Sequence, residues 1–151
     1  KYNYGYDRLI NQGSGTITNR LIGELYQFKA EFAKRIGKFD VTANGGVNIA
    51  GAVDGQFFNG QASYKFQDFD VKAGLAISSR APDFNYTLHQ SDYLNYNWQN
   101  NFNNIEKQEL SFNIASEKYI NAQVTFTTLQ DHVYFAQSLI TNANDEVTGY
   151  N

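Results

Sequence analysis

The sequence contains no cysteine, a single proline and no long apolar run. Without cysteine the chain has no disulfide framework, no thiol nucleophile and no cysteine-ligated zinc site. A transmembrane helix needs about 20 consecutive apolar residues, so the sequence excludes a helical membrane span. The mean hydropathy of −0.52 does not exclude the membrane itself, because barrel strands need only about 9–11 residues and carry their apolar positions in alternation.

Basic residues are also scarce, with 12 Lys and Arg against 15 Asp and Glu and a pI near 5.3. Nucleic-acid-binding proteins usually carry a basic surface, so we expect no nucleic-acid partner. Charged residues make up 18% of the chain, whereas aromatic residues reach 16%, with 11 Tyr and 12 Phe. This composition is typical of strands and turns, and 151 residues are enough for one domain with a real core.

The sequence contains no phosphate-binding loop, no Gly-x-Ser-x-Gly elbow and no His-Glu-x-x-His motif. Its two histidines, His89 and His132, lack further ligands at metal-binding spacing. Asp68 and Asp70 lie at or beside a predicted turn, where carboxylates favour solubility rather than acid–base catalysis. We therefore predict a protein that is not an enzyme and that uses no metal and no cofactor.

The clearest structural pattern is a hairpin over residues 57–79, folded about Gln67 and Asp68. Apolar and polar residues alternate along most of both arms, which is the period of strands with one apolar and one polar face. A two-residue turn would place Lys65 opposite Asp70 on the polar face and apolar residues opposite each other on the other face. The apolar pairs predicted are Phe66 with Phe69, Tyr64 with Val71, Ala62 with Ala73 and Phe58 with Ile77.

A second hairpin, over residues 24–53, repeats this pattern about Gly37 and Lys38. Its first arm contains good helix formers, but its apolar residues follow two-residue steps better than a 3.6-residue period, which favours a strand. Segments 35–41 and 65–71 both have a cation, an apolar residue, a two-residue turn and then Phe-Asp-Val, a weak internal repeat. The predicted pairs are Ile36 with Phe39, Arg35 with Asp40, Phe32 with Ala43 and Phe28 with Val47.

The dipeptide Asp54-Gly55 is a strong hairpin signal that joins these two hairpins. It predicts that Val47 lies near Tyr64 and that Gly45 lies beside Phe66, where an aromatic ring can cover a glycine.

The whole chain, residues 1–151, is thus predicted to be a single segment of an all-β, antiparallel, up-and-down meander. A three-residue loop at residues 117–119 would pair Phe112 with Val124. The six predicted strands are residues 24–36, 39–53, 57–66, 69–79, 105–116 and 120–135. The predicted long loops are residues 1–20, 80–104 and 136–151.

The apolar face of this meander must meet either lipid or a protein core. Tight turns near residues 37, 67 and 118 alternate with other connections, as the short periplasmic turns and longer extracellular loops of transmembrane β-barrels do. Phe39, Phe66 and Phe69 would lie where an interfacial aromatic girdle is expected. Lys34 is the only charge clearly on the apolar face, and near a turn it can snorkel. The alternative is a soluble barrel or sandwich with an ordinary core. The pattern of loops favours the membrane.

The polar face mixes charged residues with Asn, Gln, Ser and Thr, which suits a water-filled lumen. If this face lines a pore, its charges would bias permeation. The candidate pore-lining residues are Lys29, Glu31, Lys65, Lys72, Lys107 and Glu109.

The loop over residues 84–102 is rich in Tyr, Trp and Asn and is a second candidate site. Such side chains can stack on sugars or contact a partner protein. They can also form an interfacial belt or pack the loop into the mouth of a barrel. The candidate binding residues are Tyr86, Tyr93, Tyr96 and Trp98.

Two runs, Ser-Arg-Ala-Pro-Asp-Phe-Asn-Tyr at 79–86 and Gln-Ser-Asp-Tyr-Leu-Asn-Tyr-Asn-Trp-Gln-Asn-Asn-Phe at 90–102, resemble the putative porins of Bacteroidota outer membranes. The strand 107–112 and the restart at 119–122 are also similar. The resemblance covers about residues 20–135 and implies an outer-membrane β-barrel with a signal peptide removed upstream and no catalytic residues. Six strands fall short of the minimum of about eight in single-chain barrels, so further strands must come from a longer chain or from other chains.

These observations predict an outer-membrane, porin-like barrel for passive passage of small solutes, or a barrel component of an envelope complex. The expected partners are outer-membrane lipid and either other envelope proteins or further strands of the same barrel. The alternative is a soluble β-barrel or sandwich that binds a carbohydrate or protein through its aromatic loop.

Overall fold

The computed structural model describes residues 1–7, 10–12, 15–51, 53–93, 96–136, 139–141 and 147–150. The chain divides into two compact units. The first unit comprises Lys1–Tyr2, Ile22–Pro82 and Phe102–His132. The second unit comprises Asn3–Leu21, Asp83–Asn101 and Val133–Asn151.

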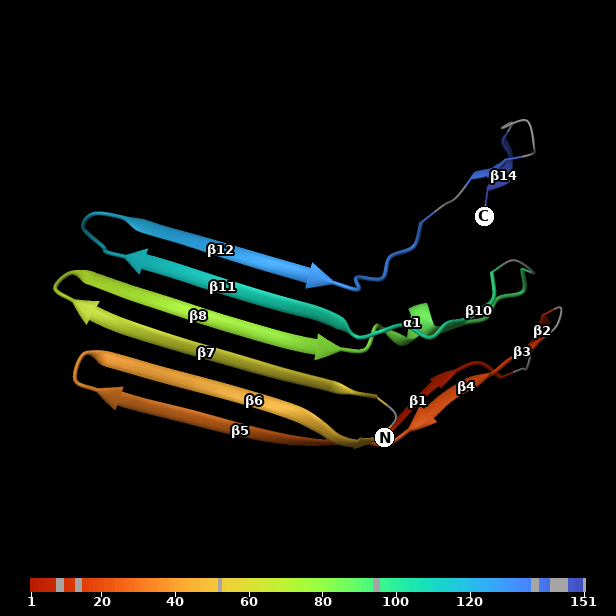
Figure 1. The fold of residues 1–151 in the computed structure, drawn as a ribbon, viewed down its shortest axis with the longest axis horizontal. Coiled ribbons are helices and arrows are strands. Elements are labelled where there is room, and N and C mark those ends of the chain that lie inside the picture. The colour runs from red at the N-terminus through yellow and green to blue at the C-terminus, as the bar shows by residue number, and fades with distance from the viewer. Residues whose placement is uncertain are drawn as a thin grey trace. The chain divides into compact units, whose positions relative to one another are not determined.

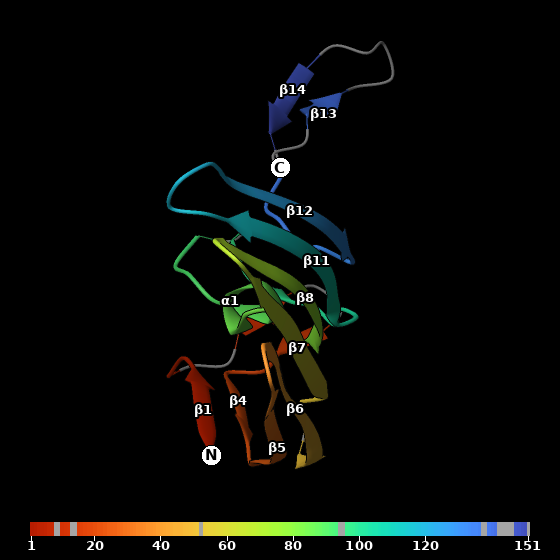
Figure 2. The same cartoon turned by 90° about the vertical axis from the view of Figure 1, so that its left-hand side faces the viewer.

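The first unit is built on one antiparallel sheet of six strands in the order β12-β11-β8-β7-β6-β5. Strands that follow one another in this unit are neighbours in the sheet, and their tight turns gather at one end (Figure 1). Seen from that end, the strand directions turn from β5 to β12 in the usual twist of a sheet (Figure 2). The predicted all-β antiparallel meander is confirmed. The strands are β5 Leu25–Ile36, β6 Phe39–Gly51, β7 Gly55–Phe66, β8 Phe69–Arg80, β11 Ile105–Ala115 and β12 Asn121–Gln130.

The largest difference from the predicted strand bounds is at the end of β12. The sequence predicts this strand as far as residue 135, but it ends at Gln130. Asp131 takes a φ of 52°, which lies outside the extended region and breaks the strand. Within the described residues, β5 and β12 are the edge strands, each with one neighbour in the sheet.

Parts of the predicted loops form short elements instead. The first predicted loop contains β1 Tyr2–Gly5, β2 Ile10–Gln12, β3 Gly15–Ile17 and the start of β4 Arg20–Gly23. The second contains α1 Phe84–Thr87, β9 Leu88–His89 and β10 Trp98–Gln99, and the described residues of the third contain β13 Leu139–Thr141 and β14 Val147–Tyr150. Local hydrogen bonds hold the second of these loops, including one from the Asn100 backbone N–H to the Thr87 carbonyl at 2.8 Å. Such short pairs of strands contain too few alternating residues to be recognised from the periodicity of the sequence.

The registers predicted for the three tight hairpins are confirmed. β7 and β8 pair Phe66 with Phe69 and Lys65 with Asp70. The other confirmed pairs are Tyr64–Val71, Ala62–Ala73, Phe58–Ile77, Ile36–Phe39, Arg35–Asp40, Phe32–Ala43, Phe28–Val47 and Phe112–Val124.

The register predicted between β6 and β7 is wrong. Gly45 faces Phe58 rather than Phe66, and Val47 faces Gln56 rather than Tyr64. Asp54-Gly55 does not close a tight turn, because the last β6–β7 pair joins Val47 to Gln56, and the end of β6, as far as Gly51, lies beyond this pairing and makes the connection wider. The Asn48 side-chain amide donates a hydrogen bond to the Val53 carbonyl across this connection, at 3.0 Å. An aromatic ring does lie opposite Gly45, but it belongs to Phe58.

The apolar face of the sheet is not covered by any described part of the first unit. Many of its large apolar side chains are exposed, from 38% for Ile114 to 68% for Val124, although others such as Phe69 are half-buried. In the described part of this unit, Pro82 and Ile105 are the only buried residues. Glu106 pairs with Gln130 and shares the face of Leu110, so Lys34 is not the only charge on this face. Because one layer of sheet cannot bury its own apolar face, something else must cover it.

The second unit has a small core of its own. Leu88 is fully buried and Ile17 is nearly so. The Gln90 side-chain amide donates to the Thr18 carbonyl at 2.9 Å, and the Thr18 backbone N–H donates to Gln99 Oε1 at 2.9 Å. In the part of the chain that the structure describes, no helix is long and apolar enough to cross a membrane.

The two repeated turns differ in one residue that matters for stability. The first turn residue has a positive φ in both, 63° at Gly37 and 52° at Gln67. Glycine adopts this conformation without steric cost, whereas other L-residues lose about 1–2 kcal/mol. We expect Gln67→Gly to stabilise the protein by up to about 1 kcal/mol, since added entropy of the unfolded chain offsets part of the gain. We expect Gly37→Gln to destabilise it by about 1–2 kcal/mol.

Urea unfolding of the detergent-folded protein measures both changes, and each turn serves as the control for the other. Equal stability of the two variants and the parent protein would contradict this account of the turns.

Candidate functional site on the polar face

The polar face of the sheet consists of rows of side chains that run across the strands. The registers of neighbouring strands connect end to end, so each row can be followed from β5 to β12. One row is Lys29, Gly46, Phe57, Ser78, Lys107 and Leu129, and the next is Glu31, Asn44, Asn59, Ala76, Glu109 and Thr127. The third is Ala33, Thr42, Gln61, Gly74, Ser111 and Thr125, and the fourth is Arg35, Asp40, Ser63, Lys72, Asn113 and Gln123.

The six residues predicted to line a pore all lie on this face. Lys29 and Lys107 share the first row, and Glu31 and Glu109 share the second. Lys72 lies in the fourth row, and Lys65 lies beyond it, opposite Asp70. The structure therefore brings four of the six charges into two adjacent rows and sets the other two apart, nearer the tight turns.

Most of the charges on this face have a partner of opposite sign close by. The Lys107 ammonium lies 2.8 Å from Glu109 Oε2, and the Arg35 Nε lies 2.8 Å from Asp40 Oδ1. The Lys72 ammonium lies 3.7 Å from Asp70. Because these side chains are partly exposed to water, each pair contributes little stability. Their main effect is to reduce the net electric field over the face.

The centre of the polar face is uncharged. The third row contains only Ala, Thr, Gln, Gly and Ser. In the second row, beside it, Asn59 Nδ2 donates to Asn44 Oδ1 at 2.9 Å and links β7 to β6. Beyond the first row, Gln27 Nε2 donates to Asn48 Oδ1 at 3.1 Å and links β5 to β6. This face can therefore offer many neutral hydrogen-bonding groups to a solute.

A hollow of about 210 Å³ lies in this neutral part of the face. Gly74 and Ala76 leave it room, because neither has a long side chain. A Cβ atom at Gly74 would come within 2.6 Å of Ser111 Oγ, so this position fits only glycine as the neighbours stand. The polar-face residues that line the hollow are Thr42, Asn44, Asn59, Gln61, Gly74, Ala76, Glu109 and Ser111.

Phe57 is the one aromatic residue on the polar face of the described strands, and sequence reasoning did not single it out. Its ring fills the space above Gly46, where a Cβ atom would come within 2.6 Å of the ring. The Lys29 ammonium lies 5.9 Å from the ring centroid. The available signal was the pair Phe57-Phe58, since two successive aromatic residues in a strand must point to opposite faces.

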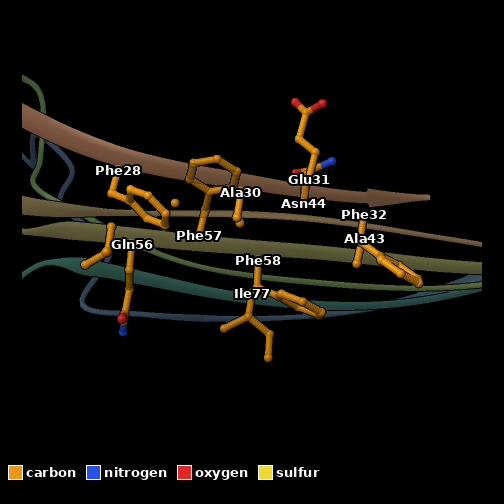
Figure 3. A pocket seen from close by; sticks show the side chains of 13 residues that line it. Phe28, Ala30, Glu31, Phe32, Ala43, Asn44, Gln56, Phe57, Phe58 and Ile77 are labelled. Carbon is orange, nitrogen blue, oxygen red and sulfur yellow. The ribbon is translucent and has the colours of Figure 1, made fainter.

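Figure 3 shows how side chains divide between the two faces of the sheet around a second, apolar hollow of about 600 Å³. Phe28, Phe32, Phe58 and Ile77 point to one side of the sheet, whereas Glu31, Asn44 and Phe57 point to the other (Figure 3). Small residues such as Ala30, Ala43 and Gly45 form the floor of the apolar hollow. A third hollow, of about 730 Å³, lies at the turns and is lined by polar and charged residues such as Lys65, Asp70 and Lys118.

The structure separates the four aromatic residues predicted as a loop binding site. Tyr86 stacks on Phe135 with ring centroids 4.6 Å apart, and Trp98 stacks on His89 at 4.4 Å. Tyr93 and Tyr96 are 73% and 62% exposed and meet edge to face at 6.2 Å.

Hydrogen bonds also hold the stacked aromatic residues of the second unit. Trp98 Nε1 donates to the Asn85 carbonyl at 3.0 Å, and Tyr6 Oη lies 3.1 Å from His89 Nδ1. Burial and a hydrogen bond with Tyr6 raise the pKa of Tyr4 to about 12. The described residues contain no group of three or more His, Cys, Asp or Glu that could hold a metal ion.

The comparisons with known proteins agree with this two-faced sheet. A family model described as "Putative porin" matches residues 1–148. Neither a curated protein nor a solved structure matches the chain. The family match spans the six strands and most of the second unit, and it bears out the resemblance to putative porins. The chain belongs to the putative porin family.

Proposed function

We propose that this chain forms part of an outer-membrane β-barrel that allows small solutes to pass through a water-filled pore. The observation that carries the proposal is a sheet with one polar face and one exposed apolar face. A barrel in lipid needs this alternation, with apolar side chains outward and polar side chains toward the lumen. Membership of a porin family supports a transport or structural role rather than catalysis.

In this proposal lipid is the partner of the apolar face, and Phe39, Phe66 and Tyr64 near the tight turns belong to an interfacial aromatic girdle. The tight turns lie on the periplasmic side and the longer connections lie outside. The free edges of β5 and β12 pair with further strands, either of the same protein or of another envelope protein, because unpaired backbone groups cannot face lipid.

The polar face lines the pore, with Lys29, Glu31, Lys65, Lys72, Lys107 and Glu109 among its charges. Closely paired charges together with a neutral central row favour weak ion selectivity over a strong preference for one sign. The exposed Tyr93 and Tyr96 keep a second role open for the aromatic loop, contact with a sugar or a partner protein outside the pore.

The direct test of a pore is electrical conductance. We expect the full-length protein, purified in detergent and added to a planar lipid bilayer, to raise the current in discrete steps. A heat-denatured sample of the same preparation is the control. A protein that stays folded and monodisperse in buffer without detergent, or that never produces current steps, would contradict the proposal.

Charge reversal tests which residues line the pore. Lys107→Glu removes the partner of Glu109 and adds a second carboxylate on the polar face. Two unit charges about 4 Å apart in water interact by about 1 kcal/mol, so we expect cation over anion permeability to rise by up to about fivefold. The reversal potential in a KCl gradient measures this ratio, and high salt should reduce the effect.

Lys118→Glu is the matched control, because Lys118 lies at a turn rather than in a strand. The same change in permeability from both substitutions would argue against a lumenal Lys107.

Arginine placed on each face tests which one meets lipid. Leu110 lies in the middle row of the apolar face, between Leu75 and Phe126. We expect Leu110→Arg to lower the stability in lipid vesicles by about 2–4 kcal/mol, the cost of a cation near the bilayer midplane. Ser111→Arg, one residue along on the polar face, should cost clearly less. Urea unfolding in vesicles compares the two, and a larger loss for Ser111→Arg would reverse the assignment of the faces.

A further inference from the structure

Phe57 and the neutral hollow lie on the same polar face, with Phe57 one row from the nearest residues that line the hollow. Asn59 lines the hollow and is two residues from Phe57 on the same face of β7. Asn44 lines it from β6 and is likewise two residues from Gly46, over which the ring lies. Two residues along a strand span about 7 Å, so a ligand in the hollow that extends over this spacing can also contact the Phe57 ring.

The nearest residues to Phe57 in its own row are small. They are Gly46 and Ser78, neither of which is tall enough to enclose a phenyl ring. The Lys29 ammonium, from the same row, lies 5.9 Å from the ring centroid, and Phe57 remains partly exposed. The ring therefore offers apolar, aromatic surface at the level of the hollow.

The hollow offers hydrogen-bonding groups of neutral character. One bond between Asn59 and Asn44 uses one donor and one acceptor, and each amide has further hydrogen-bonding capacity. Thr42, Gln61 and Ser111 add two hydroxyls and an amide.

The one carboxylate in the hollow does not make it a site for ions. Glu109 lies 2.8 Å from the Lys107 ammonium, which offsets its charge. The carboxylate oxygens can still accept hydrogen bonds from hydroxyl groups. The surface is therefore matched to an uncharged ligand that has many hydroxyl groups and one apolar side.

A saccharide ring has this chemistry. Its equatorial hydroxyls donate and accept hydrogen bonds around the rim, and its axial C–H bonds form an apolar face that packs against the negative face of an aromatic ring. We propose that the hollow and the Phe57 ring form a binding subsite for one ring of a neutral saccharide. This inference rests on the proposed pore, because the solute reaches the subsite through the lumen, and it identifies the class of solute.

A purely structural role for Phe57 gives different expectations. The ring covers Gly46, and aromatic residues that cover a glycine strengthen a sheet. If Phe57 only covers Gly46, a large aliphatic residue at position 57 would largely preserve the stability of the sheet. Saccharides would then affect neither the ion current nor the fluorescence. For saccharide binding the aromatic face is required.

Ion current in the presence of sugar separates these roles. We expect maltotriose, added to the full-length protein in planar bilayers, to block the current more strongly than polyethylene glycol of similar size. Phe57→Ala and Phe57→Leu should weaken the block by about three- to tenfold, the range expected for loss of one aromatic contact. Phe57→Trp should retain it. Phe58→Ala is the matched control, since Phe58 is the next residue and faces the other side of the sheet, and its block should match that of the parent protein.

A second measurement does not depend on conductance. Residues 1–151 contain a single tryptophan, so Phe57→Trp in a Trp98→Phe background, with any tryptophan outside these residues also replaced by Phe, leaves one indole, at the subsite. Maltotriose should change its fluorescence in detergent, whereas Phe58→Trp in the same background should not respond.

The outcomes distinguish the two proposals. Fluorescence that responds to maltotriose without any current steps would support the subsite and contradict the pore. Current steps that maltotriose leaves unchanged, together with silent fluorescence, would leave the pore standing and overturn the subsite. A block that is equally strong in the parent protein and in Phe57→Ala would also overturn it.

Discussion

The cross-strand register is the constraint on which the rest of this protein depends. Side chains alternate along a strand, so a slip of one residue would move every side chain to the other face. The tight turns at Gly37 and Gln67 hold the register, and with it Lys65 opposite Asp70 and Phe66 opposite Phe69. Turn geometry thus decides which face is polar, and the polar face carries the candidate site.

A single sheet with this alternation cannot be self-sufficient. The apolar side chains of the six strands project from one layer, and no described second layer covers them. A large exposed apolar surface is unfavourable in water, so the stability of the first unit depends on its surroundings. In the proposed barrel, lipid covers the apolar face and no second layer of protein is needed. The second unit is different, because Leu88 and Ile17 form a local core of its own.

The hairpin registers could be predicted because a two-residue turn fixes which residues face each other. In that alignment opposite charges pair on one face and apolar residues pair on the other. The β6–β7 register could not, because Asn48 and Val53 close a wider connection that Asp54-Gly55 does not reveal. The hollow was beyond prediction for a related reason. It joins Asn44 to Glu109 through three successive registers, and one wrong register displaces every residue in the row. Of the proposed subsite, only Phe57 could be recognised in the sequence, since it places an aromatic residue at a position where the alternation calls for a polar one.

In the proposed pore, the arrangement of charge on the polar face favours neutral solutes over ions. On one side of the uncharged row, Lys107 is paired with Glu109 across the first and second rows, and on the other side Arg35 is paired with Asp40 within the fourth row. Opposite charges a few ångströms apart produce a field that falls off quickly in water and salt. An ion crossing the centre of this face therefore meets little net attraction, whereas a hydroxylated solute meets amides, hydroxyls and one aromatic ring. Discrimination at such a surface comes from hydrogen bonding and shape rather than from charge.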